Sequence, residues 1–167
     1  MSAETFTTAM FLITAVIAAG VLINAVLPVI YTAAGSFSAS SHESDLRLRT
    51  DFKIVTSVVN NSYVARIWMK NTGSERIPIN DIERSDVIYG DMSNFGRMSL
   101  TTTTPLPDGT WCYTLSDLNS NTYWDPGETL EIDAKSPQIT SVTIVGTPVY
   151  FQFVLPDGIW RSTEFTV

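Results

Sequence analysis

The chain opens with a long apolar stretch. No side chain between Thr5 and Ser41 is charged, and residues 9–31 read AMFLITAVIAAGVLINAVLPVIY. About 20 helical residues span a hydrocarbon core about 30 Å thick, and a lone segment in lipid must be helical because no water solvates its backbone. The pattern therefore predicts a transmembrane or filament-core helix over residues 1–34, followed by a linker of small polar residues over 35–44, GSFSASSHES.

The pattern changes after this linker. Apolar and polar positions alternate in short runs rich in β-branched residues, with turn residues between the runs. No run of ten or more residues has helical spacing, so the runs predict strands without intervening helices. The candidate strands are LRLRTDFKIVTSVV, YVARIWMKN, IPINDI, DVIYG, RMSLTTTT, TWCYTL, TLEIDA, SVTIVG, VYFQFVL and IWRSTEFTV. We predict an α+β chain: a long N-terminal hydrophobic helix followed by an antiparallel β-sandwich, an immunoglobulin-like domain, over residues 45–167.

A short repeat supports hairpins in this domain. The pattern Leu-Pro-Asp-Gly-x-Trp occurs at residues 106–111 and again at residues 155–160. Proline presets the first turn dihedral and glycine takes the positive one, so each copy predicts a turn after which the tryptophan begins the return strand. Convergence on a favourable turn explains the repeat better than duplication does.

Small or short residues recur in the apolar stretch in pairs one helical turn apart. Such pairs let helices in lipid approach closely, although Ala and Gly are common in membrane helices in any case. Pro28 follows Asn24 by one turn, and its ring and missing amide hydrogen kink or loosen a helix there. The residues predicted to mediate helix-helix assembly are Glu4, Thr14, Ala15, Ala18, Ala19, Gly20, Asn24 and Pro28.

Glu4 has two interpretations. In the first turn of the predicted helix, its carboxylate complements the positive end of the helix dipole. In an assembled bundle it would neutralise the N-terminal amine of an adjacent helix, since a carboxylate buried among apolar helices needs a cationic partner. We expect the helix to be retained rather than cleaved as a signal peptide, because no basic segment precedes it and no A-x-A site follows it.

Composition excludes several functions. The 167 residues carry a net charge of −7, and the ten Lys and Arg residues form no run, so the chain is a poor partner for nucleic acid. Cys112 is the single cysteine and His42 the single histidine. An internal disulfide and a Cys-x-x-Cys site are therefore excluded. His42 lies in the predicted linker, where we expect a solvated side chain and not a ligand or a catalytic base. Because no pattern pairs a base with a nucleophile, we assign no catalytic residues and expect no enzyme.

Residues 117–128, DLNSNTYWDPGE, resemble a twelve-residue calcium loop. Oxygen-bearing side chains stand at loop positions 1, 3, 5, 9 and 12, and a backbone carbonyl would serve at position 7. Position 6, where such loops use glycine for a sharp turn, is Thr122, and no helices flank the loop. Asx residues are also common in turns that bind no metal. The predicted ligands of a structural Ca²⁺ are Asp117, Asn119, Asn121, Tyr123, Asp125 and Glu128.

Asn60 begins the sequon Asn60-Asn61-Ser62 in a predicted turn between two strands. Such a sequon accepts a glycan only in a domain that lies outside the cytoplasm. The sequence therefore predicts Asn60 as a glycosylation acceptor if the domain is external.

Three stretches resemble a known group of proteins. They are MSAETFTTAMFLITAVIAAGVLINAVLPVIYTAAGSF at residues 1–37, MKNTGSERI at 69–77 and WDPGETLEI at 124–132. The chain is similar to the archaellin and archaeal type IV pilin-like superfamily, which includes archaellins, archaeal pilins and archaellum accessory proteins. Its opening resembles the accessory, or stator, proteins of the FlaG (ArlG) family, since it shows neither a basic leader nor a cleavage site before a Gly- or Ala-rich start.

The resemblance implies a pilin-like helix and a structural, filament-forming role in the archaeal motility apparatus, the archaellum. The implied role is that of a stator in the cell envelope, which links motor and membrane to the S-layer and places the β domain outside the cytoplasm. The implied partners are other copies of the chain in a filament or ring, a related archaellum accessory protein, the S-layer and the membrane. Two alternatives remain open: a major filament subunit, either archaellin or adhesion pilin, and a membrane-anchored module that binds a glycan or a protein.

Overall fold

The computed structural model describes residues 2–60, 63–139 and 146–167, apart from the side chain of Ser2. The chain divides into two compact units, Met1–Asp45 and Leu46–Val167. The first unit is helical. The second contains the last helical turn and the β-rich domain.

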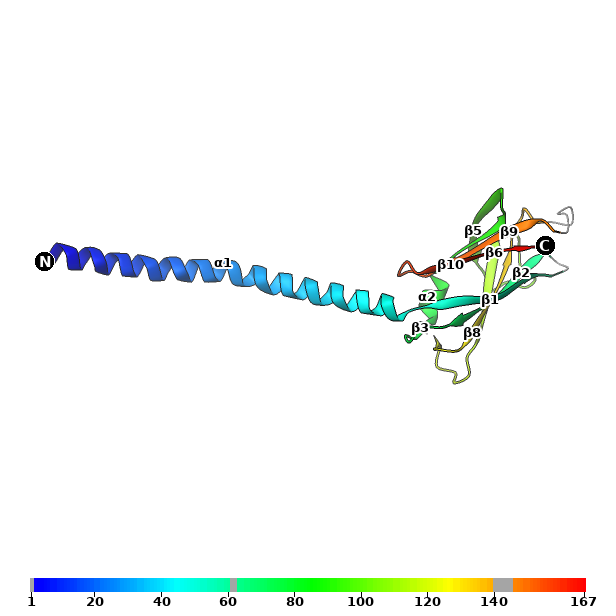
Figure 1. Ribbon diagram of the computed structural model, residues 1–167, viewed down its shortest axis with the longest axis horizontal. Coiled ribbons are helices and arrows are strands. Elements are labelled where there is room, and N and C mark those ends of the chain that lie inside the picture. Colours follow the sequence, from blue (N-terminus) through cyan, green and yellow to red (C-terminus); the bar gives the residue numbers. More distant parts are fainter. Residues whose placement is uncertain (1, 61–62, 140–145) are drawn as a thin grey trace. The chain divides into compact units, whose positions relative to one another are not determined.

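The apolar stretch forms a single helix, α1 (Ser2–Arg49), which continues through Pro28 (Figure 1). At a rise of about 1.5 Å per residue it is about 72 Å long. Judged by length and composition alone, it is the one helix in the described ranges that could cross a membrane. Threonine hydroxyls along it donate to the carbonyl one turn earlier, so they need no partner from outside the helix. These threonines are Thr7, Thr8, Thr14 and Thr32.

Residues 35–44 are helical, and the linker of irregular conformation predicted there is not found. Beyond Gly35 this segment contains no glycine or proline, so its serine and alanine residues allow the helix to continue at little cost. The strand predicted to begin at Leu46 is also wrong in its first residues. Leu46 instead lies in the last turn of α1, where its carbonyl accepts the N–H of Thr50 at 2.9 Å.

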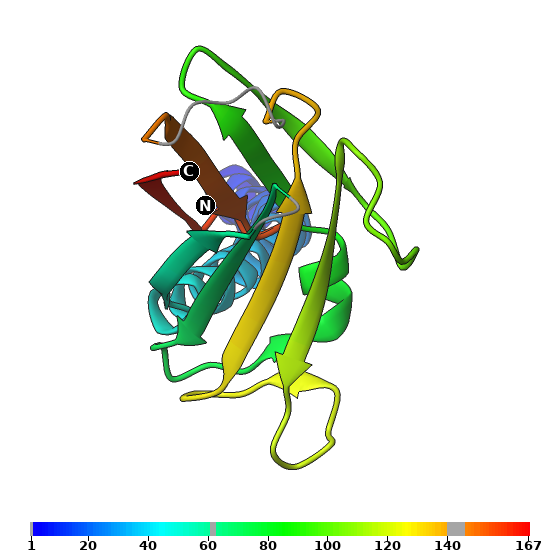
Figure 2. The ribbon, with the colours of Figure 1, turned by 90° about the vertical axis from the view of Figure 1, so that its right-hand side faces the viewer.

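The second unit contains an eight-stranded sheet that folds over into two layers (Figure 2), and a separate two-stranded sheet. Its strands are β1 (Phe52–Val59), β2 (Val64–Asn71), β4 (Asp86–Asp91), β5 (Asn94–Leu100), β6 (Thr110–Ser116), β8 (Thr129–Lys135), β9 (Pro148–Val154) and β10 (Trp160–Thr166). One layer has the order β1-β2-β8-β6 and the other the order β5-β4-β9-β10, and the pairs within each layer are antiparallel. The predicted α+β fold is therefore confirmed. A short parallel pairing of β5 with β6, which the pattern did not predict, makes the two layers one continuous sheet.

Apolar side chains from the inner faces of both layers fill the domain. Phe153 of β9 packs edge-on against Phe52 of β1 and Trp111 of β6, with ring centroids 5.5 and 6.4 Å apart. All three side chains are at most 1% exposed. In β2 and β8 every second residue is buried, as the alternating pattern predicts. A slip of one residue would turn these side chains to solvent, so burial fixes the register of the strands.

Two predicted strands have different outcomes. The segment IPINDI, residues 77–82, forms β3 (Ile77–Pro78) and the start of α2 (Ile79–Glu83) instead of one strand. Pro78 has φ −63° and directly precedes α2, a position where its missing N–H breaks no helical bond. β3 pairs with β7 (Tyr123–Trp124). The strand predicted over SVTIVG lies outside the described residues except for Gly146.

Both Pro-Asp-Gly turns contain the predicted positive dihedral, with φ 77° at Gly109 and 86° at Gly158. The second turn joins β9 to β10 as an antiparallel hairpin, which confirms the prediction there. The first does not form a hairpin. Because β5 and β6 run parallel, residues 101–109 must cross from one end of the strands to the other.

The turn after β2 forms hydrogen bonds with the C-terminal end of α1. The Arg49 carbonyl, which has no acceptor role within the helix, accepts the N–H groups of Ser74 at 2.9 Å and Glu75 at 3.2 Å. Only glycine fits at position 73 of this turn. A Cβ atom on Gly73 would lie 2.4 Å from the Arg49 carbonyl oxygen and 2.5 Å from the Asp51 nitrogen.

Candidate assembly surfaces

The residues predicted to mediate helix assembly occupy two faces of α1. A helix turns by about 100° per residue, so sequence position gives the direction of each side chain around the axis. What we call the alanine face consists of Glu4, Thr14, Ala15, Ala18 and Ala19. The glycine face, roughly opposite by the same helical geometry, consists of Gly20, Asn24 and Pro28. Two residues four positions apart lie on the same side of a helix, but different pairs can lie on different sides. The predicted residues therefore form two faces and not one seam.

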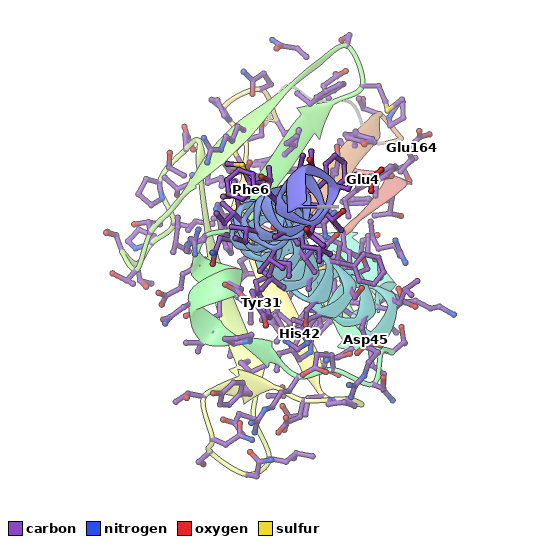
Figure 3. All side chains as sticks on the ribbon, turned by 90° about the vertical axis from the view of Figure 1, so that its left-hand side faces the viewer. Glu4, Phe6, Tyr31, His42, Asp45 and Glu164 are labelled. Carbon is purple, nitrogen blue, oxygen red and sulfur yellow. The ribbon has the colours of Figure 1, made fainter. Side chains whose placement is uncertain are left out.

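Figure 3 looks onto the N-terminal end of α1 and shows Glu4 and Phe6 on opposite sides of the helix. Glu4 marks the alanine face, and Phe6 lies on the side of the glycine face. A shallow groove of about 310 Å³ lies over the alanine face, with the larger Met10 and Phe11 beside the small residues. The Thr14 hydroxyl in this groove donates to the Met10 carbonyl at 2.8 Å. The groove can therefore receive an apolar surface without leaving this hydroxyl unsatisfied.

Hydrogen bonds within the Asp117–Glu128 loop hold its first half. The Asp117 carboxylate accepts three backbone N–H groups, those of Asn119 (3.0 Å), Ser120 (2.6 Å) and Thr122 (3.2 Å). Thr122 has φ 64°, so the sharp turn for which calcium loops use glycine is present without a glycine.

The other predicted calcium ligands bond to one another and to the backbone. The side-chain amides of Asn119 and Asn121 donate to the Asp125 carboxylate at 2.8 and 2.6 Å, and these bonds hold the pKa of Asp125 below its ordinary value of 3.8. Buried Glu128 accepts the N–H groups of Leu118 and Asp125, both at 3.0 Å.

Tyr123, the remaining predicted ligand, begins β7, and the Arg76 guanidinium lies 4.4 Å from its ring centroid. Across the described ranges, no three His, Cys, Asp or Glu side chains gather so as to hold a metal ion. Side-chain oxygens of Asp117, Asn121, Asp125 and Glu128 accept hydrogen bonds from donors of the loop itself. Calcium binding therefore stays a prediction, and the loop is braced by its own hydrogen bonds.

A groove that no sequence pattern indicated lies beside the β9–β10 turn. It has a volume of about 720 Å³ and is lined by residues 47, 48, 50, 51 and 158–162. Leu48 and Trp160 expose 85% and 51% of their surface there. Asp51 forms an ion pair with Arg161 across the groove. These two residues are 110 positions apart, and the packing of β1 beside β10 brings them together, so local sequence carries no signal of the groove.

The outer face of the sheet formed by β2, β8 and β6 is polar and internally paired. Arg66 donates two hydrogen bonds to Asp133, both at 2.8 Å, and the Trp68 indole N–H donates to Glu131 at 2.8 Å. Cys112 lies in β6, half-buried, and burial raises the pKa of its thiol. A protonated thiol is a poor nucleophile at neutral pH, in keeping with an inert residue.

Asn60 lies at the end of β1, where its side-chain oxygen accepts the Val64 N–H at 3.1 Å. The rest of the predicted sequon, Asn61 and Ser62, lies outside the described residues. Glycosylation of Asn60 stays a prediction.

Comparison with known proteins places these surfaces in context. A family model described as archaeal-type flagellin matches residues 2–165. An uncharacterized protein of Archaeoglobus fulgidus is 23% identical over 169 residues, which cover 99% of each chain. The archaellum periplasmic stator protein complex FlaF and FlaG from Sulfolobus acidocaldarius superposes with a TM-score of 0.53 at 18% identity, over 68% of this chain and 87% of that one. The archaeal flagellum of Methanospirillum hungatei strain JF1 gives a TM-score of 0.67 at 12% identity, over 97% and 92%. Both structures show a shared fold.

Proposed function

Because this chain belongs to the archaeal-type flagellin family, we propose that it is a structural subunit of the archaellum that assembles through α1. The observation that carries the proposal is the exposed apolar surface of this helix. Large apolar side chains from Phe6 to Tyr31 are 41–79% exposed. Removing apolar surface from water is worth about 25 cal/mol per Å². Lipid must therefore cover α1, or other helices must, or lipid does so before assembly and helices after it.

The two faces of α1 suit a filament or ring. A helix with one packing face forms a pair, whereas a helix with different faces on opposite sides contacts one neighbour on each side. Such head-to-tail contacts form rings when the rotation closes and filaments when it does not. The alanine face and Gly20 bear small side chains, which let neighbouring backbones approach closely in lipid or in a filament core.

Within the archaellum, we assign the chain the role of a stator that links motor and membrane to the S-layer. In this role the β domain lies outside the cytoplasm, and a related accessory protein is a partner. The resemblance of residues 1–37 to stator proteins supports this role, as does the fold shared with the FlaF and FlaG complex. The length of α1 also suits it, because a span of about 20 residues leaves helix to extend beyond the membrane.

A second candidate is the major filament subunit, an archaellin or adhesion pilin. The match to the flagellum of Methanospirillum hungatei, which covers 97% of this chain, favours this candidate. The amount of protein separates the two roles. A major subunit would dominate filaments sheared from cells, whereas a stator would stay with the cell envelope and be scarce in the sheared fraction.

Electron cryo-microscopy of the full-length chain after removal of detergent tests the proposal. We expect filaments or rings with a helical core and β domains on the outside. Chains that stay dispersed would contradict assembly. They would instead favour the third alternative, a membrane-anchored module that binds a glycan or a protein.

The substitution Gly20→Leu tests the glycine face, and Gly20→Ala at the same position is its matched control. No atom lies within 4 Å of a Cβ at Gly20, so the single chain accepts both substitutions. We expect Gly20→Leu to abolish assembly, because the larger side chain separates the backbones, and Gly20→Ala to preserve it, because alanine is still small. Circular dichroism of the β domain should be unchanged in both. Assembly of Gly20→Leu to the wild-type extent would contradict a close contact at this face.

A further inference from the structure

The loop after β6 presents a leucine to solvent in a fixed position. Leu118 is 90% exposed, the highest fraction among the exposed large apolar side chains of the described residues. Its N–H donates to buried Glu128, and the carboxylate of the preceding Asp117 accepts three further N–H groups. A side chain carried on a backbone that is already ordered loses less conformational freedom on binding. The loop is therefore a preorganised apolar projection.

The groove beside the β9–β10 turn has complementary properties. Leu48 and Trp160 give it an apolar wall, and it is an open depression of about 720 Å³. Its lining also contains two arginines, Arg47 and Arg161, against one carboxylate, Asp51. By contrast, the loop from residue 117 to residue 128 contains no basic side chain, and it presents the carboxylates of Asp117 and Asp125, whereas Glu128 is buried.

We propose that the Leu118 loop of one copy docks into this groove of the next copy. The Leu118 side chain packs against Trp160 and Leu48, and the negative charge of the loop faces the net positive charge of the groove lining. Large aromatic side chains and arginines are common energetic centres of interfaces, and opposite charge favours the correct approach. The inference rests on the proposed assembly and adds a contact between β domains to the contacts between helices.

The proposed contact is head-to-tail. Figure 1 shows the loop between β6 and β7 and the turn between β9 and β10 at separate places on the domain. Each copy therefore offers one loop and one groove, and a copy whose loop is occupied still has a groove for the next. Such a contact continues from copy to copy and is compatible with a filament or ring, but not with an isolated symmetric pair.

Cross-linking between two serines tests the contact. Ser120 is exposed in the loop, and Ser162 is exposed in the groove lining, so Ser120→Cys and Ser162→Cys change each surface by one atom. Both are made in the full-length chain with Cys112→Ser, and the assembled protein is treated with a short bismaleimide. The matched control replaces Ser162→Cys by Ser99→Cys, which is exposed on β5 and does not line the groove.

We expect the chain with both Ser120→Cys and Ser162→Cys to give a ladder of dimers, trimers and larger species. A mixture of the two single variants should give only the mixed dimer, and the Ser99→Cys control should give none. If cryo-microscopy shows assemblies but no cross-linked species form, the loop-to-groove contact is overturned and the proposed function stands. Chains that do not assemble at all would overturn both. Homodimers from Ser120→Cys alone would also overturn the head-to-tail contact.

Substitution of the leucine provides an independent measurement. Leu118→Arg removes the apolar projection and reverses the local charge, whereas Leu118→Met preserves size and polarity. We expect Leu118→Arg to raise the protein concentration needed for assembly by about tenfold or more, as loss of an interface anchor does. Leu118→Met should assemble like the wild type. Equal critical concentrations for Leu118→Arg and Leu118→Met, measured by sedimentation, would contradict the proposal.

Discussion

Phe11 in α1 and Phe153 in β9 are the same residue type in opposite surroundings. Phe11 is 79% exposed, whereas Phe153 is fully buried between Phe52 and Trp111. The contrast extends to the units that contain them, since the core apolar residues of the β domain face one another and those of α1 face outward. In the domain, burial of apolar surface stabilises the chain's own fold. In α1, apolar surface is exposed and can be buried only against other molecules.

The largest expected effect comes from the two phenylalanines. We expect Phe153→Ala to lower the free energy of unfolding of the β domain by about 3–5 kcal/mol, because it removes contacts and leaves a cavity. Phe11→Ala should leave domain stability unchanged and weaken assembly. Denaturant unfolding in detergent, followed by tryptophan fluorescence, measures both, since all four tryptophans lie in the second unit. A loss of domain stability in Phe11→Ala equal to that in Phe153→Ala would break the comparison.

Glycine substitutions test whether the domain is as tightly packed as the comparison requires. A Cβ atom on Gly90 would lie 2.6 Å from the Asn94 carbonyl oxygen and from the Phe95 Cα, whereas nothing lies within 4 Å of a Cβ on Gly96. Because backbone atoms must move, we expect Gly90→Ala to cost about 1–3 kcal/mol of unfolding free energy. Gly73→Ala, which meets the backbone of Arg49 and Asp51, should cost a similar amount. Gly96→Ala is the control, and the prediction is wrong if it destabilises as much as the other two.

The Asp125 carboxylate allows a smaller test by pH. Hydrogen bonds from Asn119 and then Asn121 lower its pKa below 3.8, so its contribution to stability is present above that value and is lost as pH falls through the lowered pKa. We expect Asp125→Asn to lower the melting temperature by roughly 1–3 °C at pH 7 and to have no effect at pH 2. A difference between the variant and the wild type that is the same at both pH values would contradict this assignment.

The smallest expected effect concerns calcium. The domain satisfies its loop carboxylates internally, with Asp117 and Glu128 both accepting backbone N–H groups. We therefore expect removal of Ca²⁺ with a chelator to change the melting temperature by less than about 1 °C, since ligand binding stabilises a fold only in proportion to its occupancy. A larger decrease that added Ca²⁺ reverses, and Mg²⁺ does not, would support the calcium loop predicted from the sequence. It would also show that the stability of the domain depends on a bound ion.

The strongest signals in the sequence concerned composition over long stretches. An uncharged run from Thr5 to Ser41 has one compatible structure in lipid, and alternating strands without helices between them have few compatible architectures. The prediction of an irregular linker was wrong because small residues such as those from Ser36 to Ser41 are compatible with both coil and helix. Nothing in their local pattern indicates that the helix continues to Arg49.

Features that depend on tertiary contacts were harder to predict from the sequence. The pairing of β5 with β6 and the groove at Trp160 both bring together distant segments, which a local pattern does not encode. The calcium-loop pattern places oxygens at suitable sequence positions but does not specify that Asn119 and Asn121 point their amide groups at Asp125. In contrast, the structure explains the glycine in the stretch MKNTGSERI, because Gly73 lies where no side chain fits.

The neighbouring positions of β1 and β10 determine when the domain can finish folding during synthesis. Contacts between residues as distant as Asp51 and Arg161 form late, because a long loop must close before they are gained. At about 5–20 residues per second, the ribosome needs on the order of 10 s to complete the chain after Arg49. The apolar helix is therefore complete while β10 does not yet exist, and the domain can close only afterwards.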